Sequence, residues 1–234
     1  MKLSDYKTKF KINLVSIITL ILLGNLVAQA QDPAQLKEIF ARSQQQNAQA
    51  LRQYAWKSRN EVKKNGESKS TKVFEMRYDA NGNLQKRQIS ATEPSLPKGP
   101  LIGRIAQKKK DDFIEMVNKL GEQVKAYSQL PPEKMQAFLA SATITPKLNE
   151  GMVQIQGEHL LQRGDVMRIF IDVKSRKQRR VEIATFFENQ PVKAVIEFSE
   201  LPAGLTYTAR TVVDYPKESL QLITENFGYQ REGR

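Results

Sequence analysis

The sequence contains no cysteine, only one histidine and only one tryptophan in 234 residues. Without cysteine the chain can form no disulfide, no thiolate nucleophile and no cysteine-ligated metal site. A lipid anchor carried by an N-terminal cysteine is excluded for the same reason. We therefore expect the stability of the fold to come from a buried core, for which residues 31–234 are enough chain to form one domain.

Sequence motifs of the common enzyme classes are missing as well. A Ser-His-Asp triad would have to use His159, and no G-x-S-x-G turn accompanies it. Neither a P-loop nor a G-x-G-x-x-G segment occurs. Asp111, Asp112 and Glu115 fall early in a predicted helix, where acidic side chains suit the helix dipole. We therefore expect no catalysis, no cofactor and no metal ion, with His159 a polar residue near a strand end.

The first thirty residues have the order of a secretory signal peptide. A mostly apolar run at residues 12–27 leads to Ala28-Gln29-Ala30, which offers small side chains at the two positions that a signal peptidase reads. An uncleaved membrane anchor is the alternative, because the uncharged stretch is about long enough to span a bilayer. We expect cleavage after Ala30 and a soluble periplasmic protein. The n-region that precedes the run carries Lys2, Lys7, Lys9 and Lys11.

The net charge of the chain is +12, which favours anionic partners such as lipid headgroups or nucleic acid. Export favours lipid, or a protein of the inner or outer membrane, over nucleic acid. Two basic clusters are candidates for contact with headgroups or an acidic partner at the rim of a site, although solvated turns and helix surface are the alternative. The clusters are Lys108, Lys109 and Lys110, and Arg176, Lys177, Arg179 and Arg180.

Hydrophobic periodicity predicts a helix, three strands and two helices in the first part of the exported chain. Asp32-Pro33 is typical of a helix start. Asn65-Gly66 and Asn81-Gly82 are hairpin turn signals and divide the strands at residues 54–63, 68–78 and 84–89. A proline-rich loop is expected at residues 90–103, then a helix at 104–130 and a short helix after Pro131-Pro132.

From residue 143 onward the sequence predicts only strands joined by short turns, which indicates an antiparallel meander. We expect residues 152–227 to form one continuous antiparallel sheet. A sheet of about ten strands curls, splits or closes, and many of these strands are apolar on one face, which the helices are expected to cover. The predicted strands are residues 143–145, 152–156, 166–173, 180–187, 192–198, 205–215 and 220–227.

This order of elements, and the strand–Asp172–turn–basic–strand pattern from Phe170 to Ile183, resembles the LolA-like periplasmic lipoprotein carriers and the related RseB-like regulators. The resemblance covers most of residues 31–229. It implies an α+β fold at residues 31–234, with a large antiparallel sheet curled into an incomplete barrel and two or three helices over its concave face. It also implies an apolar cavity that takes acyl chains of lipids or lipoproteins.

Trp56 is expected to point into this cavity, toward the helix that carries Phe113, Met116 and Leu120, although residue type alone is equally consistent with ordinary core. Three hypotheses follow: a monomeric lipid or lipoprotein carrier, a sensor module that binds a membrane-protein partner, and an enzyme that would need a polar cleft at His159. The candidate lining residues are Tyr54, Trp56, Phe74, Met76, Tyr78, Phe113, Met116, Leu120, Ile183, Phe187, Ile196 and Phe198.

Overall fold

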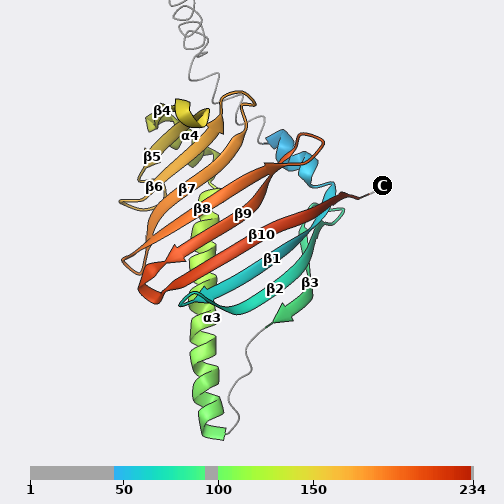
Figure 1. Ribbon diagram of the computed structural model, residues 1–234, viewed down its shortest axis with the longest axis vertical. Coiled ribbons are helices and arrows are strands. Elements are labelled where there is room, and N and C mark those ends of the chain that lie inside the picture. Colours follow the sequence, from blue (N-terminus) through green and yellow to red (C-terminus); the bar gives the residue numbers. More distant parts are fainter. Residues whose placement is uncertain (1–44, 93–99, 233–234) are drawn as a thin grey trace, which may run out of the picture. The chain divides into compact units, whose positions relative to one another are not determined.

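The structure is a computed structural model that describes residues 45–92 and 100–232, which belong to one compact unit, Gln45–Arg234 (Figure 1). The predicted signal peptide and most of the helix predicted from Asp32 lie outside the described residues. The helical elements are a helix at residues 45–51, α3 (Pro100–Ser128), α4 (Pro132–Ser141), and the 3-10 turns η1 (Leu148–Glu150) and η2 (Pro216–Glu218). The strands are β1 (Tyr54–Lys64), β2 (Glu67–Tyr78), β3 (Leu84–Thr92), β4 (Thr143–Lys147), β5 (Met152–Glu158), β6 (Val166–Asp172), β7 (Gln178–Phe187), β8 (Gln190–Glu200), β9 (Thr206–Tyr215) and β10 (Leu220–Arg231).

All ten strands form one antiparallel sheet in the order β3-β2-β1-β10-β9-β8-β7-β6-β5-β4. The N-terminal meander joins the C-terminal one through β1 and β10, where Val62 lies opposite Leu222. Because β3 and β4 are both edge strands, the curled sheet is not closed into a barrel. The α+β prediction and the continuous sheet predicted for residues 152–227 are confirmed.

Local turn chemistry accounts for the hairpins. Asn65 and Gly66 have φ values of 54° and 79°, the left-handed conformation that a two-residue hairpin turn with matching twist requires. Glu188 and Asn189 adopt the same region between β7 and β8, with φ values of 49° and 61°. In the second predicted turn, the Asp79 carboxylate accepts the backbone N–H groups of Asn81 and Asn83, both at 2.9 Å.

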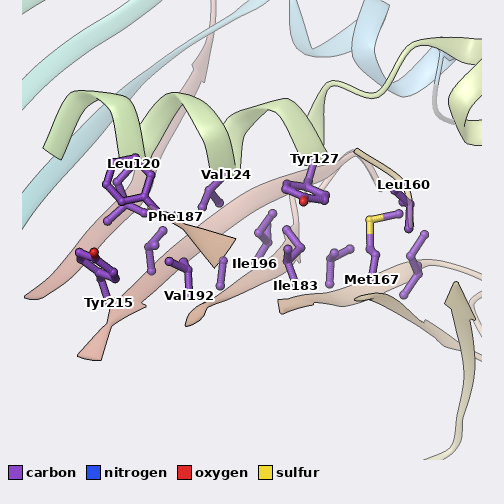
Figure 2. Packing of buried hydrophobic residues seen from close by; sticks show 14 of the residues in the cluster. Leu120, Val124, Tyr127, Leu160, Met167, Ile183, Phe187, Val192, Ile196 and Tyr215 are labelled. Atoms are coloured by element: carbon purple, nitrogen blue, oxygen red, sulfur yellow. The ribbon is translucent and has the colours of Figure 1, made fainter. Parts of the chain in front are cut away.

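The core lies between α3 and one face of the sheet, which we name the inner face (Figure 2). Leu120, Val124 and Tyr127 point from α3 toward the strands and are at most 3% exposed. Burying a large apolar side chain in this way contributes about 1.5–3 kcal/mol. α4 adds Phe138, whose ring lies against the backbone of Gly157 in β5. Strand residues of the core include Met167, Ile169, Val181, Ile183, Phe187, Val192, Ala194, Ile196, Val213, Tyr215 and Leu220.

The opposite, outer face of the sheet carries a ladder of charged side chains across β1, β10, β9 and β8. Arg59 pairs with Glu225 at 3.1 Å, and Arg210 lies between Glu225 and Glu197 at 3.6 and 3.8 Å. Exposed pairs of this kind add little to stability. They do leave this face polar, so the apolar side of the sheet is the inner face.

The predicted loop at residues 90–103 is wrong at both ends, because β3 continues to Thr92 and α3 begins at Pro100. Proline suits the first turn of a helix, where its missing N–H has no intrahelical acceptor. Pro100 therefore starts a helix that the periodicity alone places later. Among residues 45–92 and 100–232, no helix is both long enough and apolar enough to cross a membrane.

Candidate functional site

Four aromatic rings from four strands meet on the inner face, and we name them the aromatic cluster: Trp56, Tyr78, Tyr207 and Tyr229. The indole of Trp56 stacks on Tyr229, with 5.5 Å between ring centroids and 6° between planes. Tyr78 lies 5.8 Å from Trp56, and Tyr207 lies 4.4 Å from Tyr229. All four side chains are half-buried, unlike the fully buried residues of the core under α3.

Strand alternation and a bulge in β10 place Trp56, Tyr78 and Tyr229 on the same face, and Tyr207 joins them through its contact with Tyr229. Even-numbered residues of β1 face inward, as the packing of Val62 against the core shows, so Trp56 faces inward too. In β10 the register shifts opposite residues 55–57, and Gly228 there has a φ of 64°. The extra residue reverses the alternation and turns Tyr229 inward. Sequence reasoning missed Tyr207 and Tyr229, although a glycine within a strand pattern is a signal for a bulge.

The aromatic cluster lies away from the place where α3 crosses β1. The ring of Phe113 in α3 lies 5.3 Å from the Lys64 ammonium, at the far end of β1. At about 3.3 Å per residue, Trp56 lies about 26 Å from Lys64 along the strand. Trp56 therefore packs on rings of β2 and β10 and not, as the sequence predicted, on Phe113, Met116 and Leu120.

The helix at residues 45–51, and Arg52 directly after it, lie next to strands that carry the aromatic cluster. Asn47 forms two hydrogen bonds with the backbone of Thr206, which begins β9: its amide donates to the carbonyl at 2.6 Å and its oxygen accepts the N–H at 2.7 Å. The guanidinium of Arg52 lies 5.8 Å from the centroid of the Tyr78 ring. Burial raises the pKa of Tyr229, so its phenol stays protonated and neutral at physiological pH.

Next to the aromatic cluster, the inner face of β2 carries Phe74 and Met76, each 9% exposed. The ammonium of Lys86 in β3 lies 3.8 Å from the centroid of the Phe74 ring. Burial lowers the pKa of Lys86, and the like charges of Lys72 and Lys125 lower it further. An amine in this setting favours the approach of an anion. The sequence had not singled out Lys86.

Pockets on the surface of the described residues include two that lie near candidate residues. One of about 490 Å³ lies beside the C-terminal part of α3 and includes Tyr127, Gln162 and Phe187. The other, of about 780 Å³, lies at the β2–β3 hairpin. Two of its acidic side chains already have partners, since Glu75 forms an ion pair with Arg87 and Asp79 accepts a backbone hydrogen bond within the turn. The residues that line the larger pocket are Glu75, Arg77, Tyr78, Asp79, Gln85, Lys86, Arg87 and Glu232.

The candidate lining residues of the sequence divide into two groups. Tyr54, Trp56, Phe74, Met76 and Tyr78 lie in β1 and β2 at or near the aromatic cluster. The remaining residues belong to the packed core or lie against it, so this part of the predicted cavity is filled by side chains. These residues are Phe113, Met116, Leu120, Ile183, Phe187, Ile196 and Phe198.

The residues of the predicted basic rim do not form one surface. Arg179 and Arg180 are neighbours in β7 and therefore point to opposite faces of the sheet. Arg179 pairs with Glu200 at 2.9 Å, and Arg180 lies 3.0 Å from Glu182 with its guanidinium over the ring of Phe170. Arg176 occupies the turn before β7. Lys108, Lys109 and Lys110 lie in α3, where the first two are exposed.

His159 has a structural role, as its Nδ1 accepts the N–H of Gly164 at 2.8 Å within the loop before β6. The fully buried Asp165 of the same loop accepts three backbone N–H groups and the hydroxyl of Tyr127. Within the described ranges, no group of three or more acidic or histidine side chains is placed to hold a metal ion.

The fold and the aromatic cluster define an α+β protein with an open ten-stranded sheet and a half-buried aromatic surface on its inner face. No family model matches the chain. No curated protein matches it either. Among solved structures, the chain is similar to the crystal structure of a DUF1329 family protein from Desulfovibrio piger, with 8% sequence identity over 86% of this chain and 94% of that chain and a TM-score of 0.41. The LolA-like resemblance of the sequence stays a prediction.

Proposed function

We propose that this protein is exported to the periplasm, where it binds the acyl chain of a lipid or lipoprotein on the aromatic cluster. One observation carries the proposal: four half-buried rings continue the apolar inner face beyond the part that α3 covers. Each methylene that leaves water for such a surface contributes roughly 0.8 kcal/mol. Tyrosine and tryptophan supply large apolar area while their polar tips stay hydrated.

The chemistry of this surface suits reversible binding. Trp56 and Tyr229 present flat ring faces along which a flexible chain can lie. Phe74 and Met76 of β2 are buried beside this surface and support it from the neighbouring strand. A binding protein of this kind releases its ligand without any bond being made or broken, which agrees with the missing catalytic motifs.

The only tryptophan of the chain gives a direct test, because Trp56 lies in the proposed site. Full-length protein is expressed in a bacterium, recovered from the periplasm and titrated with laurate or a lysophospholipid. We expect a saturable change in Trp56 fluorescence. By calorimetry, Tyr229→Ala should weaken binding by at least about five-fold, which corresponds to about 1 kcal/mol.

Phe227 offers a matched control, since it lies in the same strand but is 44% exposed on the outer face. Phe227→Ala should leave the affinity unchanged. The proposal fails if no lipid perturbs Trp56, or if Tyr229→Ala and Phe227→Ala bind equally well.

The competing hypothesis, a module that binds a membrane-protein partner, is favoured by the packed core under α3, which restricts the apolar surface to the region around the aromatic cluster. A protein segment could place an apolar side chain there. A photo-crosslinking amino acid at position 207 separates the two in living cells. Lipid adducts support the carrier, and an adduct with one specific membrane protein supports the module.

A further inference from the structure

On the inner face, one row of side chains crosses five neighbouring strands and changes along its length from aromatic and apolar groups to a positive charge. From β9 to β3 the row contains Tyr207, Tyr229, Trp56, Met76 and Lys86. Tyr207 contacts Tyr229, and Tyr229 stacks on Trp56. Trp56 lies directly opposite Met76, and Met76 lies directly opposite Lys86. Four apolar or aromatic side chains therefore lead to one cation.

Lys86 lies at the edge of the sheet, because β3 pairs with β2 alone among the described strands. Strands lie about 4.8 Å apart, so the backbone of Lys86 is about 10 Å from that of Trp56, and both side chains are on the inner face. An extended chain that starts at the edge strand would pass Met76 and Trp56 and reach the rings of β10 and β9.

The charge of Lys86 has no acidic partner in the described part of the chain. Its ammonium instead lies over the ring of Phe74, at 3.8 Å from the centroid. Lys72 precedes Phe74 by two residues and so faces inward as well. Burial first, and then the like charges of Lys72 and Lys125, lower the pKa of Lys86.

We propose that the ligand is an amphiphile with an anionic oxygen group, a carboxylate or a phosphate, which Lys86 binds at the edge of the sheet while the acyl chain lies along the row toward Tyr207. This inference rests on the proposed function and specifies the headgroup. An ionic hydrogen bond from the ammonium to the anion is stronger than one between neutral groups. The anion also pairs with the charge of Lys86, for which the described part of the chain supplies no acidic partner.

Laurate and its methyl ester test the inference, since they have the same chain and differ in charge. Both affinities are measured from Trp56 fluorescence and by calorimetry on the full-length protein. The wild-type protein should bind laurate about ten-fold more tightly than the ester, the size expected for a charge-assisted hydrogen bond. Lys86→Gln should remove this preference and leave the affinity for the ester unchanged, and Lys86→Glu should reverse it.

Lys193 is a suitable control, because it is an exposed lysine of β8 on the outer face, opposite Asp214. Lys193→Gln should keep the full preference for laurate. Equal binding of laurate and ester by the wild type, or an unchanged preference in Lys86→Gln, overturns the headgroup site while the acyl-chain site stands. If neither compound perturbs Trp56, both proposals fail.

Discussion

Trp56 and Tyr229 are stacked nearly parallel, with 6° between their planes and 5.5 Å between their centroids, although they come from opposite ends of the sheet-forming sequence. The contact depends on the bulge at Gly228, which turns Tyr229 to the inner face. An aromatic pair contributes about 0.5–1.5 kcal/mol beyond the burial of its area.

Tyr229→Ala should expose the indole of Trp56 and shift its fluorescence emission to longer wavelength, with a loss of at least about 1 kcal/mol in the free energy of unfolding. Tyr229→Phe keeps the ring and should retain the emission of the wild type. Fluorescence spectra and urea unfolding measure both effects. An unshifted spectrum in Tyr229→Ala would show that Trp56 is packed by other groups.

The sequence was sufficient for the elements that local signals determine. Asn65-Gly66 and Asn81-Gly82 marked the first two hairpins correctly, and period-two alternation located every strand to within a few residues. The pairing of β1 with β10 was not predicted, because residues such as Val62 and Leu222 are far apart in sequence and no local pattern links them.

The candidate site was predicted only in part, for two physical reasons. Alternation identified Trp56, Phe74 and Met76 as one face. Tyr229 was missed because the last strand was predicted to end at residue 227 and the bulge at Gly228 breaks the alternation beyond it. Apolar strand residues such as Ile183 and Ile196 have the same pattern whether a helix packs on them or a ligand does. Only the path of α3 across the sheet distinguishes core from binding surface (Figure 2).

Gly157 in β5 has no room for a side chain. A Cβ atom there would lie 2.5 Å from Cδ2 and 2.6 Å from Cε2 of Phe138, whose ring is 3% exposed and cannot move freely. Gly157→Ala should therefore displace α4 and lower the free energy of unfolding by about 1–3 kcal/mol, as overpacking does.

Gly121→Ala is the control for this substitution, since nothing lies within 4 Å of a Cβ at that position in the middle of α3. Alanine should stabilise the helix there by about 0.5–1 kcal/mol. Urea unfolding of both variants gives the comparison. The steric explanation is wrong if Gly157→Ala is as stable as the wild type, or if adding Phe138→Leu to it recovers no stability.

Tyrosine ionisation should destabilise the fold at alkaline pH. Burial raises the pKa of Tyr127 and of Tyr229. Asp165 raises that of Tyr127 further, against the lowering effect of its hydrogen bonds with Thr185 and Gln162, and Tyr207 and Tyr78 raise that of Tyr229. Because the pKa is raised in the folded state, the contribution of each phenol to the free energy of unfolding is complete below the unfolded pKa of about 10. It is lost as the pH rises from there toward the folded pKa. The free energy of unfolding should thus begin to fall near pH 10 and continue to fall at higher pH. Tyr229→Phe should reduce this slope and remove one late-titrating phenol from an ultraviolet absorbance titration.

Asp165 is the buried acid that ties α3 to the loop before β6. Its Oδ1 accepts the N–H of Leu160 at 2.7 Å, and its Oδ2 accepts those of Leu161 and Gln162, both at 2.9 Å. Oδ2 also accepts the hydroxyl of Tyr127 at 2.8 Å, so the hydroxyl of Thr185, 2.7 Å away, donates to the Tyr127 oxygen. Both carboxylate oxygens are therefore required as acceptors.

Asp165→Asn should cost at least about 3 kcal/mol in the free energy of unfolding, because either orientation of the amide turns an NH₂ group toward a backbone donor and leaves buried groups unpaired. Asp111→Asn, on the exposed surface of α3, should change stability by less than about 0.5 kcal/mol.

The acid dependence gives a second check. Burial raises the pKa of Asp165, but the N–H groups of the loop and the Tyr127 hydroxyl outweigh it, and the net pKa is below the ordinary value. Because the folded pKa is depressed, the contribution of the Asp165 carboxylate to the free energy of unfolding is present above the unfolded pKa of about 3.9. It is lost as the pH falls through the folded pKa. The stability difference between wild type and Asp165→Asn should thus be constant from neutral pH to about pH 5 and shrink below about pH 4. A difference that stays constant into strong acid would mean that Asp165 is not ionised in the folded protein.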